Sequence, residues 1–290
     1  MTGTTVRRVT AAGAAALVLA LGATACGSDG GSDAKNGSAT STATDSATGP
    51  AAAGTSAGAS AGVPKASGSI TVFAAASLKE TFTDLGKRFE AANPGAKVAF
   101  NFGGSSALAT SINAGAPADV FAAASAATMK TVADAGGAAG APQTFVRNTL
   151  AIAVPKGNPK HLAGLADLAA PGVKVALCAK EVPCGAAALT ALKAANVTLT
   201  PVTLEQDVKG ALTKVELGEV DASLVYRTDV RADSGKIDGV DFPEAAQAVN
   251  DYPIAALAKA PNKDGAAAFV AYVQSPEAQQ VLTAAGFQAP

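Results

Sequence analysis

Histidine and tryptophan are scarce in this sequence of 290 residues, which contains one histidine and no tryptophan. A histidine-based metal site or a Ser-His-Asp triad would have to use His161, which lies in an expected loop. No G-x-S-x-G motif stands at an expected strand-to-helix turn, where a hydrolase would place its nucleophile. We therefore expect that the protein is not an enzyme, and we interpret His161 as a solvated side chain.

A strong charge of either sign is also missing, because the formal net charge is −1 and only 16% of the residues are charged. Without a basic patch, a nucleic-acid partner is not expected. No cluster of histidine or carboxylate side chains falls at the expected turns, which disfavours a metal site and leaves no cofactor to predict. Hydrophobic residues make up 49% of the chain, enough for a sizeable core and two lobes.

The apolar stretch near the N-terminus, "VTAAGAAALVLALGATA", is too short and too rich in Ala and Gly for a confident membrane span. It follows Arg7 and Arg8 and ends at small residues directly before Cys26, which resembles a lipoprotein signal. Residues 1–26 are therefore predicted to be a signal peptide with Cys26 as the lipidated residue. An ordinary secretory signal is the alternative, because Ala23 stands where leucine is usual. Export by the general or the twin-arginine route stays open.

Residues 27–68 consist mainly of Gly, Ser, Ala, Thr and Asp, with almost no bulky apolar side chain. Such a segment cannot bury enough surface to offset its ordering entropy, so we expect a disordered linker. It would tether a folded part, beginning near Ser69, to the extracytoplasmic face of the cell membrane.

Strands and helices alternate after residue 68. Short apolar runs such as "SITVFAAA" and "ADVFAAAS" predict buried strands. Leu78, Phe82, Leu85 and Phe89 recur at helical spacing in the segment that follows the first strand. The alternation predicts an α/β fold with parallel-rich sheets, in which ligands bind beyond the carboxyl ends of the strands.

Three of the expected strand-to-helix turns share a style. In "AAASLKE", Ser77 stands at an expected N-cap with Glu80 three residues on, which predicts a capping box. In "FGGSSALA", two glycines and Ser105 open the next helix, and glycine there allows a ligand to approach the backbone. In "VPCGAAAL", Cys184 precedes a helical run although it is a poor cap. Helix N-termini present free N–H groups and a partial positive charge, so these turns favour anion binding.

The sequence has three cysteines, and two of them, Cys178 and Cys184, lie six positions apart. In an exported protein such a pair favours a disulfide over a metal site, with two reduced, buried thiols as the alternative. A bridge would stiffen a loop that contacts ligand. Cys26 is then left over, as lipidation requires.

Together these segments resemble the periplasmic molybdate-binding proteins of ABC importers. The resemblance covers essentially all of residues 69–290 and is carried by "VFAAASL", "GGSSALATSINAGAPADVF", "EVPCG", "EQDVKGALTKVELGEVDASLVYRTDV" and "DFPE". It implies a two-lobed periplasmic solute-binding fold of type II, with two crossovers between the lobes and the ligand in the cleft. The first lobe would comprise residues 69–147 and 249–290, and the second residues 148–248.

The resemblance also implies a ligand and its contacts. Molybdate or tungstate would be held by Ser77 and Ser105 through hydroxyl and N–H groups, by the N–H groups of Cys184 and Val208, and by the phenol of Tyr226. Cys184 stands where the family often has alanine, which still allows a backbone contact. The protein would work as a monomer and deliver its ligand to the membrane subunits of an ABC permease.

Three alternatives stay open at this point. The same fold could bind another oxyanion such as sulfate or phosphate, or a metal complex. A secreted hydrolase would need a base that the sequence does not offer. A surface adhesion module without a ligand is opposed only by the glycine-serine turns.

Overall fold

The structure, a computed structural model, describes residues 66–290. The expected signal peptide 1–26 with Cys26, and the linker up to residue 65, lie outside the described residues. The last part of the expected linker belongs to the fold: Ala66 is buried and its N–H donates to Asn93 Oδ1, and Gly68 pairs with Ala96. Composition could not reveal this, because backbone groups and not bulky side chains hold the segment in place.

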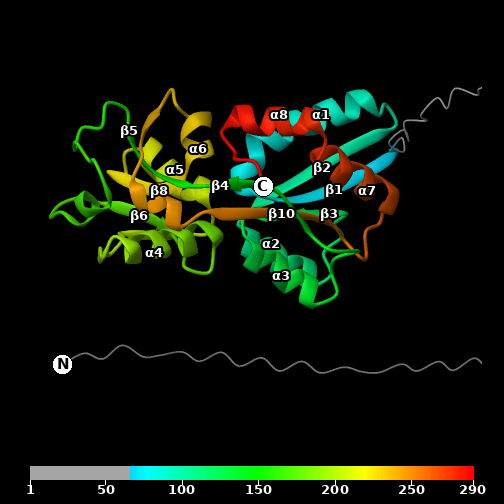
Figure 1. Cartoon of the computed structure of the whole chain (residues 1–290), viewed down its shortest axis with the longest axis horizontal. Coiled ribbons are helices and arrows are strands. Elements are labelled where there is room, and N and C mark those ends of the chain that lie inside the picture. Colours follow the sequence, from blue (N-terminus) through cyan, green and yellow to red (C-terminus); the bar gives the residue numbers. More distant parts are fainter. Residues whose placement is uncertain (1–65) are drawn as a thin grey trace, which may run out of the picture. The chain divides into compact units, whose positions relative to one another are not determined.

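The first sheet has the order β2-β1-β3-β10-β4. Strand β1 pairs in parallel with β2 and β3, whereas β10 runs antiparallel to β3 and β4. Its strands are β1 (Gly68–Ala75), β2 (Ala96–Gly103), β3 (Val120–Ala122), β4 (Gln143–Asn148) and β10 (Asn250–Ala256). The accompanying helices are η1 (Ala76–Leu78), α1 (Lys79–Ala92), α2 (Ser105–Asn113), α3 (Ala126–Asp134), α7 (Lys263–Val273) and α8 (Pro276–Ala285). We call this sheet with its helices the first lobe (Figure 1).

The second sheet repeats the design with the order β7-β6-β8-β5-β9. Strand β6 is parallel to β7 and β8, and β5 is antiparallel to β8 and β9. Its strands are β5 (Leu150–Pro155), β6 (Val175–Cys178), β7 (Thr203–Glu205), β8 (Ala222–Tyr226) and β9 (Ile237–Val240). Its helices are η2 (Leu165–Ala169), α4 (Pro183–Ala194), α5 (Val208–Glu216), α6 (Arg227–Ala232) and η3 (Pro243–Gln247). This is the second lobe.

The chain passes between the lobes twice, once after β4 and once before β10 (Figure 1). These two strands lie next to each other as an antiparallel pair. The two-lobed α/β fold expected from the sequence is confirmed. Strand β4 was not expected, because "QTFVRN" is half polar: only Phe145, Val146 and Asn148 of it are buried.

Alternating residues of β1 serve two cores. Ile70, Val72 and Ala74 face the side covered by α1 and α7, and Phe73 faces the side covered by α2 and α3. Phenylalanine rings fill the larger core of the first lobe: Phe269 is fully buried and meets Phe89 edge-on at 5.3 Å between ring centroids.

Replacing Phe269 by alanine removes a ring that packs on Phe82, Phe89 and Phe100. We expect Phe269→Ala to lower the free energy of unfolding by about 3–5 kcal/mol, measured by urea unfolding. The control is Leu217→Ala, because Leu217 is 67% exposed, and its effect should stay within about 0.5 kcal/mol. Equal losses for the two variants would contradict this description of the core.

Candidate functional site

A small cavity lies between the two lobes. Every strand-to-helix turn that the sequence singled out contributes to its wall. The first lobe supplies Ala75, Ala76, Ser77, Gly103, Gly104, Ser105 and Ala124, and the second supplies Val182, Pro183, Cys184, Asp207, Val208 and Tyr226. The structure therefore brings together all five residues expected at a ligand site, although they are spread over 150 positions of the chain. The cavity is narrow, so it suits a small ligand.

Ser77 does not form the expected capping box. It lies in the 3-10 turn η1, helix α1 starts two residues later, and no side chain caps that helix. Its hydroxyl instead shares a hydrogen bond of 2.8 Å with the hydroxyl of Tyr252 on β10. The extra 3-10 turn rotates Ser77 away from the capping position, and Glu80 is free to make another contact. A serine hydroxyl in such a pair can still interact with a third group.

Ser105 is the first residue of α2 and is buried. Its Oγ accepts a hydrogen bond of 3.0 Å from the N–H of Ala124. The next residue, Ser106, donates its hydroxyl across the lobes to the carbonyl oxygen of Glu181. Gly104 is needed here because a Cβ at that position would overlap the carbonyl oxygen of Gln206 in the second lobe. The turn before α2 is therefore a contact between the lobes as well as a wall of the cavity.

The turn before α4 carries the expected disulfide: Cys178 at the end of β6 is bonded to Cys184. No side chain caps α4, and Pro183 occupies its first turn, where a missing N–H costs nothing. Gly185 is required because a Cβ there would overlap the carbonyl oxygens of Cys178 and Ala179. The cysteine thus joins the helix start to the strand end, and its own side chain is not needed as a cap.

Val208 and Tyr226 complete the wall on the second lobe. Val208 begins α5, whose cap is Asp207: its Oδ1 accepts from the N–H of Gly210 at 2.9 Å. Tyr226 ends β8, is 1% exposed, and accepts a hydrogen bond of 3.1 Å from Asn250 Nδ2. Burial raises the pKa of the Tyr226 hydroxyl well above its usual value, so the phenol keeps its proton. The residue offers a neutral O–H group.

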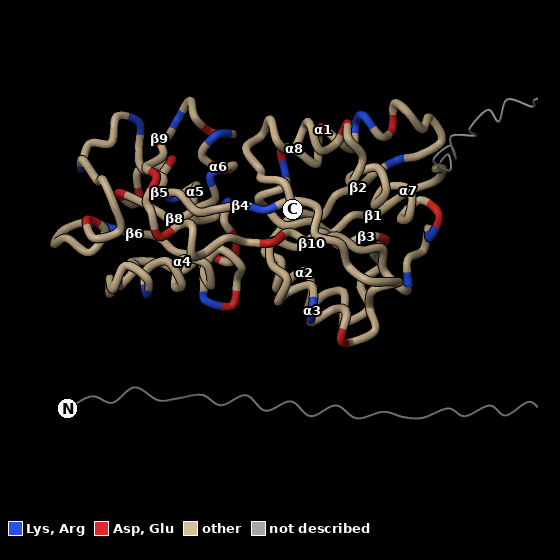
Figure 2. The backbone as a smooth tube through the Cα atoms, in the orientation of Figure 1, with Lys and Arg blue, Asp and Glu red and all other residues tan. Residues whose placement is uncertain are grey.

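The residues that line the cavity include no lysine or arginine. Partial positive charge at the cavity comes from the N-termini of α2, α4 and α5, which meet there, and the one carboxylate in the wall, that of Asp207, caps α5. Figure 2 shows charges of both signs spread over the two lobes.

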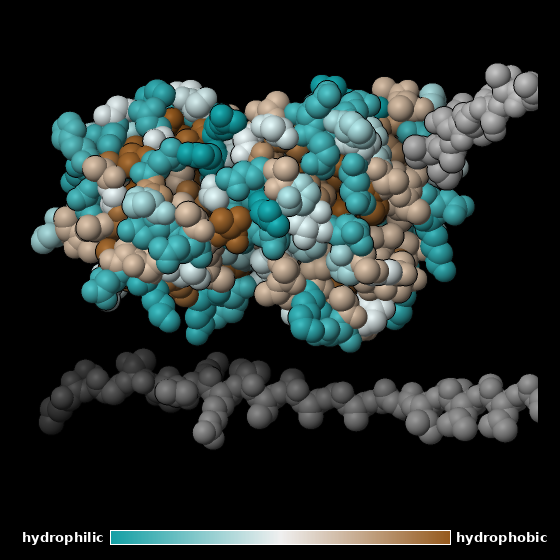
Figure 3. Space-filling view, viewed as in Figure 1, coloured by the Kyte–Doolittle hydropathy of each residue, from teal (hydrophilic) through white to brown (hydrophobic). Residues whose placement is uncertain are grey.

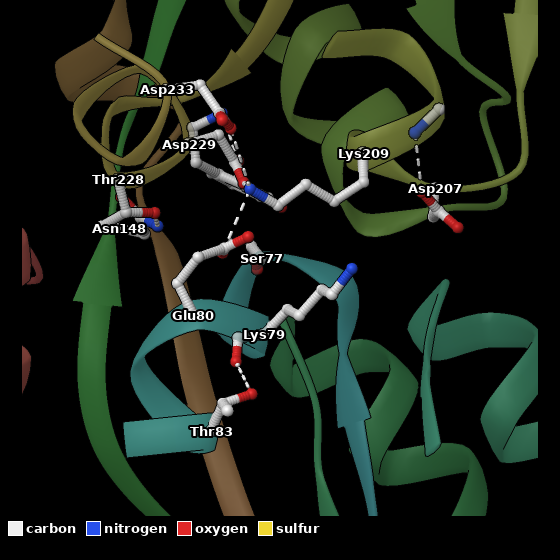
Figure 4. A network of polar contacts seen from close by, with 12 residues as sticks. Ser77, Lys79, Glu80, Thr83, Asn148, Asp207, Lys209, Thr228, Asp229 and Asp233 are labelled. Carbon is white, nitrogen blue, oxygen red and sulfur yellow. Dashed lines mark hydrogen bonds and ion pairs between the residues drawn. The ribbon is translucent and has the colours of Figure 1, made fainter. Parts of the chain in front are cut away.

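Two cations directly follow wall residues in the sequence, and both are held by carboxylates. Arg227, after Tyr226, pairs with Asp241, and Lys209, after Val208, joins a larger network. Its Nζ lies 3.1 Å from Glu80 Oε2 on the first lobe, 3.2 Å from Asp229 Oδ1 and 3.6 Å from Asp233 Oδ2 (Figure 4). Burial disfavours the charge on Lys209, but the nearby carboxylates outweigh this and raise its pKa. Sequence analysis missed this network, because its members come from α1, α5 and α6 and form no local motif.

Asp229 is the most strongly buried carboxylate of this network, with a side chain that has no exposed surface. Burial raises its pKa to about 6 despite the opposing charge of Lys209. Its other oxygen accepts from the N–H of Tyr226 at 3.2 Å, which ties the network to the wall of the cavity.

Residues 66–290 contain neither a membrane-spanning helix nor a metal-binding cluster. No helix there is long and apolar enough to cross a membrane, and no group of three or more histidine, cysteine or carboxylate residues is placed to hold a metal ion.

A small cavity between two α/β lobes, lined by hydroxyl groups and helix N-termini, defines a solute-binding protein. A family model described as bacterial extracellular solute-binding protein matches residues 70–288, and the chain belongs to this family. It is 46% identical over 222 residues to the molybdate-binding protein ModA of Mycobacterium tuberculosis, an alignment that covers 77% of this chain and 85% of that protein.

Solved structures share the fold. The periplasmic molybdate-binding protein of Azotobacter vinelandii is 20% identical with a TM-score of 0.67, covering 76% of this chain and 99% of that one. The sulfate-binding protein SubI from Mycobacterium tuberculosis is 20% identical with a TM-score of 0.66, covering 76% of this chain and 86% of that one.

Asp229 predicts a pH dependence of stability. Its pKa is about 6 in the folded protein and 3.8 as an unperturbed carboxyl, so the folded state binds the proton more tightly. Its contribution to stability is complete below pH 4 and is lost as the pH rises through about 6. We expect the stability of Asp229→Asn relative to the unsubstituted protein to rise by roughly 2 kcal/mol between about pH 4 and pH 7. Urea unfolding of both proteins across this range measures the change, and a constant difference would contradict it.

Proposed function

We propose that the protein binds molybdate, and also tungstate, outside the cytoplasm and delivers it to the membrane subunits of an ABC importer. The observation that carries this proposal is the cavity itself, in which neutral donors from both lobes converge and no cationic side chain is present. The 46% identity to a protein named for molybdate binding supports the choice of ligand.

In this proposal the hydroxyl groups of Ser77, Ser105 and Tyr226 and the N–H groups of Cys184 and Val208 hold the four oxygens of the dianion. Each hydrogen bond to a charged partner contributes roughly 1.5–3 kcal/mol net. Several of them, drawn from both lobes, suffice for sub-micromolar affinity after the cost of association. The ligand accepts hydrogen bonds and has none to donate. The wall offers it these donors, and its one carboxylate, that of Asp207, already accepts from the N–H of Gly210.

Selection by size requires a stiff wall, because sulfate has the same charge and shape as molybdate but is smaller. The Cys178–Cys184 disulfide, the close approach at Gly104 and the contact of Ser106 with Glu181 restrict movement of the turns that supply donors. Sulfate or phosphate is the second candidate ligand, since SubI, named for sulfate, shares the fold.

The same proposal covers the setting of the protein. Cys26 would carry the lipid anchor at the extracytoplasmic face of the membrane, and residues 27–65 would form the tether. The protein would act as a monomer without enzymatic activity. On the face seen in Figure 3, strongly hydrophobic residues form only small, separate patches, which supports a monomer.

Titration calorimetry of the purified protein with molybdate, tungstate, sulfate and phosphate tests the function directly. Saturable heat with molybdate and tungstate is the expected result. Saturable heat with sulfate or phosphate alone would select the second candidate, and no heat with any of the four would reject both.

Ser105→Ala tests the proposed contacts. Removing its hydroxyl should weaken molybdate binding by at least about 1 kcal/mol, because a hydrogen bond to a charged ligand is lost. Thr110→Ala is the matched control, since Thr110 lies on the same helix and its hydroxyl bonds only to the carbonyl of Ser106. Unchanged affinity in Ser105→Ala would remove Ser105 from the site.

A further inference from the structure

Asn250 stands where the chain returns from the second lobe to the first, as the first residue of β10. It is 7% exposed, and its Nδ2 donates two hydrogen bonds, one to the carbonyl oxygen of Ala124 at 2.6 Å and one to the hydroxyl of Tyr226 at 3.1 Å. Ala124 belongs to the first lobe and Tyr226 to the second, and both line the cavity. One buried amide therefore contacts the wall on both sides.

The partners of this amide fix its orientation. A backbone carbonyl only accepts hydrogen bonds, so the nitrogen of Asn250 and not its oxygen must face Ala124. The second N–H of the same nitrogen then points at Tyr226, whose phenol oxygen accepts it. A phenol has one proton, and with its oxygen engaged as an acceptor that proton can be donated, either to a ligand in the cavity or to the neighbouring hydroxyl of Tyr252.

The hydroxyl of Ser105, like that of Tyr226, accepts a hydrogen bond from the protein, in this case from Ala124. The N–H of Ala124 donates to Ser105 Oγ, and the carbonyl of Ala124 is the group that Asn250 holds. The hydroxyl of Ser105 therefore also accepts a hydrogen bond from the protein and keeps its own proton free. The donors that Asn250 supports thus come from α2 in one lobe and from β8 in the other.

A second asparagine repeats the arrangement. Asn148 on β4 is paired with Asn250 in the sheet register. Its Oδ1 accepts from the N–H of Thr149, so its Nδ2 faces the hydroxyls of Thr228, at 2.9 Å, and Tyr252, at 3.5 Å. Tyr252 is the partner of Ser77. Each crossing strand thus presents an amide donor to a tyrosine hydroxyl.

We propose that Asn250 is a positioning residue of the anion site, which sets the hydroxyls of Tyr226 and Ser105 as donors toward the cavity from opposite lobes. This rests on the proposed function, because it requires an oxyanion in the cavity. Asn250 acts through Tyr226 and Ala124 and does not touch the ligand. A ligand that only accepts hydrogen bonds benefits from each hydroxyl whose proton is directed at it.

The test is a double-substitution cycle read by calorimetric titration with molybdate. Asn250→Ala should raise Kd about tenfold or more, as expected for a weakened hydrogen bond to a charged ligand. In a Tyr226→Phe background, which has no phenol to orient, the same substitution should cost clearly less, because the two residues act together. Asn113→Ala is the matched control: Asn113 is an exposed asparagine that bonds to Thr131 outside the cavity, and Kd should stay within about twofold.

A second variant keeps the size of the side chain, and the thermal midpoint shows whether each variant folds. Asn250→Asp keeps the shape of the side chain and replaces its donor nitrogen by an oxygen that accepts, so the phenol of Tyr226 would donate to it and not to the ligand. We expect Asn250→Asp to weaken binding at least as much as Asn250→Ala, with the thermal midpoint of the ligand-free protein measured alongside.

The outcomes separate the two proposals. Suppose that the unsubstituted protein binds molybdate. If either Asn250 variant then has a Kd within about twofold of it, or if the losses of affinity at Asn250 and Tyr226 are additive, the proposed role of Asn250 is wrong and the proposed function stands. If the unsubstituted protein binds none of the four oxyanions, the proposed function fails and this inference fails with it.

Discussion

The site depends on the contact between the two lobes at the N-termini of their helices. Donors on α2 and donors on α4 and α5 face one cavity only because the turns before these helices approach closely. Gly104 permits this approach, since any larger residue would meet the backbone at Gln206. The hydroxyl of Ser106 and the ion pair of Glu80 with Lys209 then hold the same two surfaces together. The site is a property of the pair of lobes and of neither alone.

The two cations that directly follow wall residues in the sequence, Lys209 and Arg227, are both paired with carboxylates. Lys209 follows Val208 directly, yet its ammonium group turns to Glu80, Asp229 and Asp233 (Figure 4). An anion in the cavity would therefore meet dipoles and hydroxyl groups whose positions are fixed by the fold. Fixed dipoles discriminate by distance, whereas a flexible ammonium group adapts to anions of different size. The absence of a lysine or arginine from the wall thus favours selectivity over simple attraction.

The sequence predicted much of this arrangement, and its failures share a cause. Ser77, Ser105, Cys184, Val208 and Tyr226 meet at one cavity because the carboxyl ends of parallel strands share an edge, which alternation of strands and helices already implies. The capping box at Ser77 was wrong because a single 3-10 turn shifted the start of α1, and no local pattern distinguishes the two. The roles of Asn250 and Lys209 rest on partners far away in the chain, so no spacing could reveal them.

The crossing strands show why such distant partners gather at the site. A chain that changes lobes twice leaves and re-enters the first lobe through β4 and β10, and the register of these strands sets Asn148 opposite Asn250. Buried amides at this point need hydrogen-bond acceptors, because an unpaired one is costly. The available acceptors are the hydroxyls of Tyr226, Tyr252 and Thr228 and the carbonyl of Ala124. The hydrogen bonds that these buried amides require thus also orient hydroxyl groups around the cavity. The strands that connect the lobes therefore also help to arrange the donors of the site.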